Sequence, residues 1–215
     1  MVLFLQQFLK IIGRPKRLPG DFFCFEFRVS GFEFGQLKTQ NSKLKTDKMK
    51  VLKFGGSSVG SPEAIEQVVD ILEKRYRAGE RFAVVFSAFS KVTDSLIECA
   101  HRAASGDKNW SVVFEKIKAR HFEAIEKLLK PENRAVAEKH ILLNFNDLGD
   151  ILHGVFLVKE LSPRSLDLIV SFGERNSAFL VAQAMTQRGI PSSFLDARLV
   201  VRTDENFGSA KVEMA

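Results

Sequence analysis

From Met49 onward, short apolar runs alternate with longer stretches of helical spacing. The run Lys50 to Phe54 predicts a first strand. Apolar residues then recur every three or four positions, which predicts a helix from Pro62 to the turn at Gly79. The nearly continuous apolar run Phe82 to Phe86 predicts a central parallel strand that is covered on both faces.

The remaining elements follow with the same alternation. Further helices are predicted for Thr93 to Ser105, Trp110 to Leu129, Arg134 to Leu161 and Ser162 to Gly189, the last broken near Ser171 to Gly173. Two more strand candidates are Pro191 to Asp196 and Leu199 to Val201. Strands joined by helices in this order predict an α/β fold, an open and mainly parallel sheet with helices on both faces. In such folds ligands bind at the carboxyl ends of the strands.

A glycine-rich turn follows the first predicted strand, in the sequence Lys53-Phe54-Gly55-Gly56-Ser57-Ser58-Val59-Gly60-Ser61-Pro62. Glycines let the backbone approach a ligand closely, and the first N–H groups of a helix are unpaired and carry partial positive charge. Ser61 as N-cap, Pro62 and Glu63 mark the start of that helix. Because Lys53 adds a full positive charge at the edge, the turn is a candidate phosphate-binding loop.

Other interpretations of this turn remain open or fail on its residues. The spacing of Gly55 and Gly60 matches a Walker A loop, but Ser61-Pro62 stands where that motif requires Lys and Ser or Thr. The spacing Gly56-x-Ser58-x-Gly60 matches a nucleophile elbow, which would make Ser58 the nucleophile of a serine hydrolase. A purely structural tight turn is the third interpretation. All four histidines lie in helical patterns, which disfavours the hydrolase.

Two further polar motifs fall at element ends. Ser87 to Asp94 follows the second predicted strand, and its simplest interpretation is a helix start capped by Ser90 or Thr93. In Ser171 to Ser177, Glu174 and Arg175 stand beside a glycine before a long apolar stretch, where a solvated helix N-terminus would also explain an acidic residue. Neither motif is specific alone, so their order and spacing decide between the interpretations.

Composition and charge narrow the function classes. Of the 215 residues, 45% are hydrophobic and 27% charged, which is ordinary for a globular protein. The net charge of +6 divides into +5 for residues 1–48 and +1 for the remainder, so the body is nearly neutral and gives no indication of nucleic-acid binding. The two cysteines, Cys24 and Cys99, form no metal-binding cluster and fit a reducing compartment. We expect no protein-bound metal.

Residues 1–48 form a predicted irregular or disordered extension, and 49–215 the folded domain. The extension contains eight of the 20 Phe residues but lacks a sustained period. Its apolar start, residues 1–12, is too short and too interrupted to span a membrane, and we expect no membrane association. Met49 could itself serve as the translation start, in which case the extension is nonessential or mistranslated. We expect a cytoplasmic protein, with an organelle as the alternative if the extension is a transit peptide.

The motifs together resemble those of the aspartate kinases, in the amino-acid kinase family. The glycine turn is similar to that family's Lys-Phe/Tyr-Gly-Gly-Thr/Ser-Ser signature, with Ser57 where threonine is common. The segment Val85 to Asp94 resembles its Val-x-Ser-Ala…Thr-Asp/Asn segment, and Ser171 to Ser177 its Gly-Glu-x-x-Ser motif. Asp196 to Gly208 is similar to the Asp-x-Arg…Arg-Thr-x-x-x-Phe-Gly stretch that follows. His153 to Pro163 is similar to the versions fused to homoserine dehydrogenase.

The resemblance implies transfer of the ATP γ-phosphoryl group to the β-carboxylate of L-aspartate, the first step toward lysine, threonine and methionine. It makes Lys53 a catalytic residue and Lys53, Gly55, Gly56 and Ser57 the ATP-phosphate site. It places Ser87, Thr93 and Glu174 at the aspartate, with Glu174 paired to its α-ammonium group. ATP with Mg²⁺ would be the substrate complex, and the full-length protein a homo-oligomer.

The matched region covers residues 49 to about 210, which is the substrate half of such a kinase domain. The family's Gly-Arg-Gly-Gly-Ser-Asp loop and its adenine-binding half would lie beyond Ala215, so we expect a fragment that is inactive alone. The alternatives are a kinase for another carboxylate such as glutamate or acetylglutamate, a serine hydrolase that uses Ser58, and a noncatalytic kinase remnant.

Overall fold

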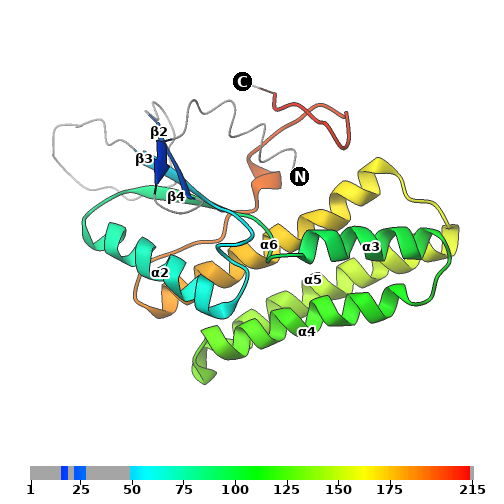
Figure 1. Cartoon of the computed structure of the whole chain (residues 1–215), viewed down its shortest axis with the longest axis horizontal. Coiled ribbons are helices and arrows are strands. Elements are labelled where there is room, and N and C mark those ends of the chain that lie inside the picture. Colours follow the sequence, from blue (N-terminus) through cyan, green and yellow to red (C-terminus); the bar gives the residue numbers. More distant parts are fainter. Residues whose placement is uncertain (1–15, 19–21, 28–48, 214–215) are drawn as a thin grey trace.

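A small sheet lies beside a set of long helices in this chain (Figure 1). The computed structural model describes residues 16–18, 22–27 and 49–213. Its elements are the strands β1 (Lys16–Leu18), β2 (Phe22–Phe27), β3 (Met49–Phe54) and β4 (Phe82–Phe86), the helices α2 (Pro62–Arg77), α3 (Val92–Ala104), α4 (Trp110–Leu128), α5 (Pro131–Val158) and α6 (Pro163–Gln187), and the 3-10 helix η1 (Ala197–Leu199). The predicted α/β class is confirmed.

The sheet has the order β1-β2-β3-β4, and it is mixed rather than mainly parallel. β3 and β4 are parallel, with Lys53 opposite Val85, whereas β2 pairs antiparallel with β3 and β1 with β2. The prediction that residues 1–48 are irregular is therefore wrong for β1 and β2, and the rest of that segment lies outside the described residues. β2 contains four Phe in six residues, and such aromatic segments pair readily along an open strand.

Most of the predicted helices are confirmed within a few residues. α2 begins at Pro62, where the Ser61 hydroxyl accepts a hydrogen bond from Ala64 N at 3.3 Å, as the capping signal predicted. The predicted cap of α3 is wrong. Lys91 occupies the N-cap with φ of 65°, and no side chain caps the helix. The loop before α3 is held instead by contacts with other segments, since Ser90 O accepts from Arg120 and Ser90 packs against Gly60.

α6 runs without a break from Pro163 to Gln187, so the predicted interruption near Ser171 to Gly173 is wrong. The glycine that suggested a break serves a contact instead. A Cβ on Gly173 would lie 2.8 Å from Ala88 Cβ and 3.2 Å from Val92 Cγ1. α6 can therefore approach α3 and the end of β4 only because residue 173 has no side chain.

Neither of the two later strand candidates forms a strand. Residues 191–196 join no sheet, and Leu199 belongs to η1. Leu199 is 81% exposed, although the sequence alone suggested a strand. The backbone here closes local turns instead, with Val200 N donating to Ala197 O and Arg198 N to the Asp196 side chain. A strand requires a neighbour to accept its hydrogen bonds, and the described residues pair nothing with the outer edge of β4.

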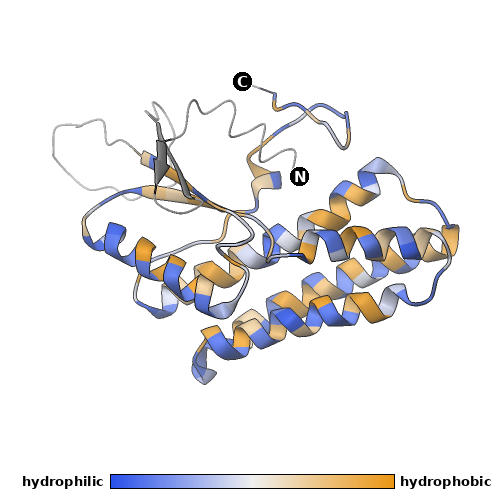
Figure 2. Ribbon diagram, in the orientation of Figure 1, coloured by the Kyte–Doolittle hydropathy of each residue, from blue (hydrophilic) through white to orange (hydrophobic). Residues whose placement is uncertain are grey.

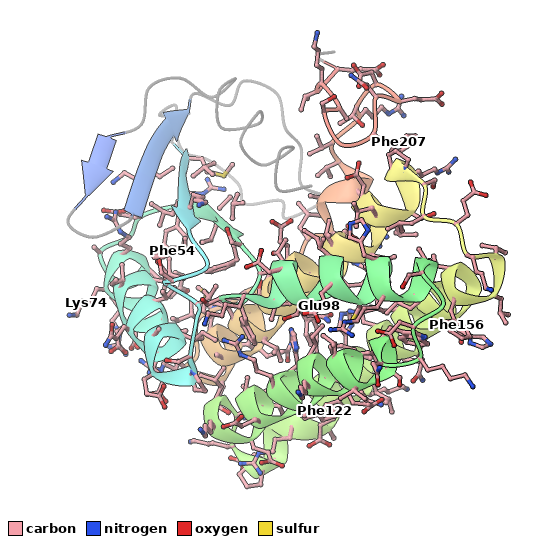
Figure 3. All side chains as sticks on the ribbon, turned by 45° about the vertical axis from the view of Figure 1, so that its right-hand side comes forward. Phe54, Lys74, Glu98, Phe122, Phe156 and Phe207 are labelled. Carbon is pink, nitrogen blue, oxygen red and sulfur yellow. The ribbon has the colours of Figure 1, made fainter. Side chains whose placement is uncertain are left out.

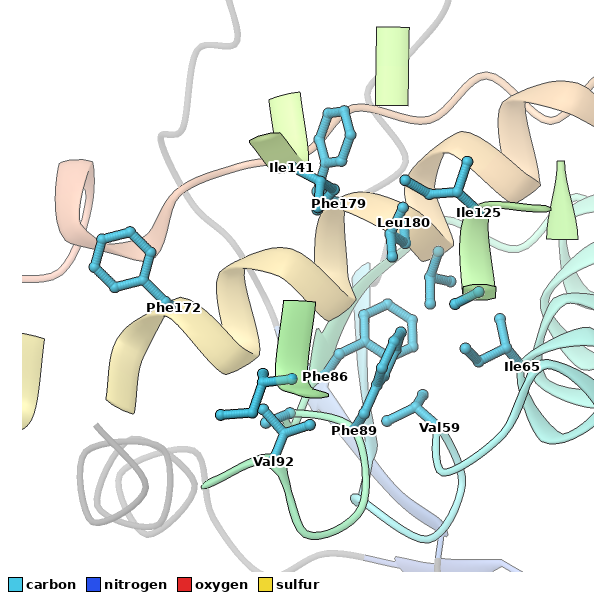
Figure 4. Packing of buried hydrophobic residues seen from close by; sticks show 14 of the residues in the cluster. Val59, Ile65, Phe86, Phe89, Val92, Ile125, Ile141, Phe172, Phe179 and Leu180 are labelled. Atoms are coloured by element: carbon cyan, nitrogen blue, oxygen red, sulfur yellow. The ribbon is translucent and has the colours of Figure 1, made fainter. Parts of the chain in front are cut away.

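The hydrophobic core lies between one face of the sheet and the helices. Figure 2 shows mainly apolar residues in β3 and β4 and a mixture of apolar and polar positions along the helices. Leu52, Phe54 and Phe86 contribute from the strands. The helices supply most of the rest, including Ile65, Val92, Ile125 and Leu180, and Phe89 adds to it from the loop between β4 and α3 (Figure 4). The described helices lie on one side of the sheet (Figure 1). The predicted coverage of the sheet by helices on both faces is therefore not found among the described residues. α5 is long and apolar enough to cross a membrane, but its inner residues pack within the helical layer.

Candidate functional site

The glycine-rich turn connects β3 to α2 and forms one wall of the candidate site. Ser58 N donates to Gly55 O at 3.0 Å, which closes the turn. The N–H groups of Gly55, Gly56 and Ser57 donate to no other described residue, so they remain able to bind an anion. Val59 is fully buried and anchors the turn in the core.

Gly56 and Gly60 let the turn pack tightly against the loop between β4 and α3. A Cβ on Gly56 would lie 3.3 Å from Ala88 O, and one on Gly60 would lie 3.2 Å from Ser90 Cβ. Neither glycine has a φ in the left-handed region. The glycines are thus explained by this close approach, and the turn and the loop form adjoining walls of one site.

Lys53 lies at the end of β3, where the turn begins. A Cβ on Gly55 would lie 3.5 Å from Lys53 Nζ, so the ammonium group is beside the turn. The predicted phosphate-binding residues Lys53, Gly55, Gly56 and Ser57 are therefore brought together, with a cation next to the three available N–H groups.

Ser87 is held between β3 and α6 by its backbone. Its N–H donates to Phe54 O at 3.1 Å, which extends the parallel ladder, and its carbonyl accepts from Ser177 Oγ at 2.7 Å. Thr93 follows in the first turn of α3, half-buried, next to Val92, which contacts α6 at Gly173. The carboxyl end of β4, the start of α3 and the middle of α6 therefore meet beside the glycine turn.

Glu174 lies in the middle of α6 and is only 5% exposed. The interpretation of this residue as a solvated helix start is therefore wrong. Its Oε2 atom has no hydrogen-bond partner among the described residues. Burial raises the pKa of Glu174 to about 7, although the positive charge of Lys53 opposes this shift. A buried carboxylate without a partner is costly, and a cationic ligand would remove that cost.

Sequence reasoning missed Arg120, which lies on α4. Its guanidinium donates from Nη2 to Gly60 O at 2.6 Å and from Nη1 to Ser90 O. These carbonyls belong to the two walls of the site. No local motif marks Arg120, because its partners are 60 and 30 residues away in the chain.

The stretch after α6 folds back onto that helix. Arg175 Nε lies 3.4 Å from Asp196 Oδ2, and both side chains are 14% exposed. Further on, Gly208 N donates to Asp167 Oδ2 at 2.7 Å, and Phe207 lies near the start of α6 (Figure 3). The Asp196 to Gly208 segment is thus fixed to α6 by contacts that begin next to Glu174.

The structure gives no support to a hydrolase based on Ser58. A nucleophile elbow holds its serine in a strained turn beside a histidine. Ser58 does not have a positive φ, and none of the histidines in the described part of the chain hydrogen-bonds to it. Within residues 16–18, 22–27 and 49–213, no group of three or more His, Cys, Asp or Glu side chains is placed to hold a metal ion.

Comparison with known proteins agrees with this arrangement. Bifunctional aspartokinase/homoserine dehydrogenase 1 of Zea mays, a chloroplastic protein, is 31% identical over 157 residues, which is 73% of this chain and 17% of that protein. Aspartokinase of Candida albicans is 30% identical over 163 residues, 73% of this chain and 29% of that protein. E. coli aspartokinase III, solved in complex with aspartate and ADP, superposes with a TM-score of 0.66 at 27% identity, over 75% of this chain and 34% of that one.

These relatives are much longer than this chain, which spans less than a third of the two curated proteins. The sequence profile of the amino acid kinase family matches residues 48–213, a range that contains the glycine turn, the β4–α3 loop and Glu174. Since that match covers more than half of the sequence, this chain belongs to the amino acid kinase family.

Proposed function

We propose that this chain carries the carboxylate-substrate and γ-phosphate part of an aspartate kinase. The observation that carries the proposal is Glu174, a buried carboxylate without a described partner, placed within electrostatic reach of Lys53 beside the glycine turn. An amino acid has an ammonium group that such a carboxylate would bind. The likeness to aspartokinases supports aspartate as the acceptor.

In the proposed reaction, an oxygen of the aspartate β-carboxylate forms a bond to the γ-phosphorus of ATP. The bond from that phosphorus to the oxygen bridging to ADP breaks, and its electron pair leaves with ADP. The acceptor needs no general base because a carboxylate is already ionised near neutral pH. Positioning and charge stabilisation therefore supply the catalysis.

Each site residue has a role in this reaction. Lys53 neutralises charge on the transferring phosphoryl group, and the N–H groups of Gly55, Gly56 and Ser57 bind its oxygens. Ser87 and Thr93 contact the aspartate, and Glu174 binds its α-ammonium. ATP enters as its Mg²⁺ complex, and the product β-aspartyl phosphate leads toward lysine, threonine and methionine. We also propose a homo-oligomer for the full-length protein and a cytoplasmic location.

Ligand binding tests this function without requiring turnover. L-Aspartate should bind the chain in calorimetric titrations, and Glu174→Gln should weaken binding tenfold or more, the scale of a lost charge-assisted hydrogen bond. Succinate lacks the α-ammonium, so its weaker binding should be the same in both proteins. Glu98→Gln is the control, because Glu98 is exposed on α3 and paired with Arg102.

Other outcomes would point elsewhere. Tighter binding of L-glutamate than of L-aspartate would transfer the proposal to a kinase for another carboxylate. No binding of either amino acid would contradict the proposal and favour a noncatalytic relative.

A further inference from the structure

Arg120 joins the two walls of the site from behind. One guanidinium donates to Gly60 O, in the glycine turn, and to Ser90 O, in the loop between β4 and α3. The planar fork of arginine can hold two acceptors in a fixed relation, which a lysine ammonium on its flexible stem cannot do. The relative position of the two walls therefore depends on this side chain as well as on their direct packing at Gly56 and Gly60.

Packing around the clamp fixes the guanidinium as well. The ring of Phe89, next to Ser90, lies 6.0 Å from the Arg120 guanidinium carbon and stacks on His121 with centroids 4.9 Å apart. Phe89 and His121 are both buried. Two adjacent residues of α4 thus hold the β4–α3 loop. The buried ring of His121 stacks on Phe89, and the guanidinium of Arg120 donates to Ser90 O.

We propose that Arg120 is a positioning residue that keeps the phosphate-binding turn in register with the substrate-binding loop. The turn carries the N–H groups available to phosphate, and the loop lies between Ser87 and Thr93. Transfer of a phosphoryl group depends on ångström-scale placement of the donor phosphate relative to the acceptor. Arg120 therefore acts through the turn and the loop, without touching either substrate. What the loops bind rests on the proposed function, whereas the clamp does not.

Hydrogen exchange on the full chain tests the clamp without a ligand. Arg120→Gln should speed amide exchange about tenfold or more in peptides that cover 55–61 and 88–93, while α5 and α6 remain as protected as in the parent. Arg120→Lys, which keeps the charge, should loosen the same two loops. Arg134→Gln is the matched control, because Arg134 also donates to two carbonyls, Leu129 O and Glu126 O, but away from the site.

A second measurement tests the consequence for binding. L-Aspartate affinity should fall about tenfold in both Arg120 variants and remain unchanged in Arg134→Gln. Unchanged exchange in the two loops, or equal loss of protection throughout the molecule, would overturn the clamp. Loosened loops with unchanged aspartate affinity would overturn the positioning role. Parent-like aspartate affinity in Arg120→Lys would overturn it as well. If the parent binds no aspartate, the proposed function fails, and the exchange experiment still decides on the clamp.

Discussion

At Glu174, burial and charge are in conflict. The side chain is almost inaccessible, Oε2 lacks a described partner, and burial raises its pKa to about 7. A group buried in this way costs folding free energy whenever it is ionised. Selection for stability alone would favour an uncharged residue here, so a ligand that requires the charge is the better explanation.

The cost should be measurable as a dependence of stability on pH. Folding raises the pKa of Glu174 from 4.5 to about 7. The contribution of the protonated side chain to the free energy of unfolding is therefore fully present below pH 4.5 and is lost as pH rises through 7. Without ligand, Glu174→Gln should therefore be more stable than the parent at pH 8, by about 3 kcal/mol at most, and nearly equal to it at pH 4.5. Urea unfolding of both proteins across this range checks the difference, and parallel curves would show that Glu174 is not buried as described.

At the scale of elements, the site depends on how closely α6 approaches α3 and the end of β4. Gly173 faces Ala88, Val92 and Leu96, and Ser177 donates to Ser87 O one helical turn further along. These two positions hold α6 against the loop on one side, while Arg120 holds the loop against the glycine turn on the other. Glu174 lies between Gly173 and Ser177 on α6, so its position depends on these contacts of α6 with the loop and α3.

The close approach predicts opposite effects for the same substitution at two helical glycines. Gly173→Ala should destabilise the chain by about 1–3 kcal/mol, because its Cβ would overlap Ala88. Gly154→Ala, in α5, should stabilise it by roughly 0.5–1 kcal/mol, since nothing lies within 4 Å of the added Cβ and alanine favours a helix. Thermal unfolding of the two variants provides the comparison. A stabilising Gly173→Ala would mean that α6 can move away from α3 without cost.

At the scale of the whole molecule, the pairing of β2 with β3 connects the N-terminal part of the chain to the strand that leads into the site. β2 covers β3 along its full length, from Phe27 opposite Met49 to Phe22 opposite Phe54. β3 in turn leads into Lys53 and the glycine turn. Residues before Met49 therefore support the strand from which the phosphate-binding turn begins.

Deletion of residues 1–48 should accordingly lower the melting temperature, by roughly 5 °C or more, because β3 would lose β2 and become an edge strand paired only with β4. Deletion of residues 1–15 leaves β1 and β2 intact and serves as the control. Calorimetry of the three chains measures the effect. If the chain that starts at Met49 has the same melting temperature as the parent, the β2–β3 pairing contributes nothing to stability. That result would support the irregular extension expected from the sequence.

Local patterns predicted the elements whose signals lie close together in the chain. Ser61-Pro62 marked the start of α2, the apolar run at Phe82 to Phe86 marked β4, and the glycine turn stood out by its residues alone. Each signal depends on neighbours within a few positions, because capping, helical spacing and strand propensity are local properties of the backbone.

The sequence by itself thus determined the α/β class, most helices and the motifs, and the resemblance they carry led to the family. Only the tertiary structure decided that α6 passes Gly173 unbroken, that β2 joins β3, that Glu174 is buried and that Arg120 bridges Gly60 and Ser90. The physical reason is that these features are contacts between segments far apart in sequence. A glycine or a carboxylate has the same local propensity whether a distant helix packs against it or solvent surrounds it.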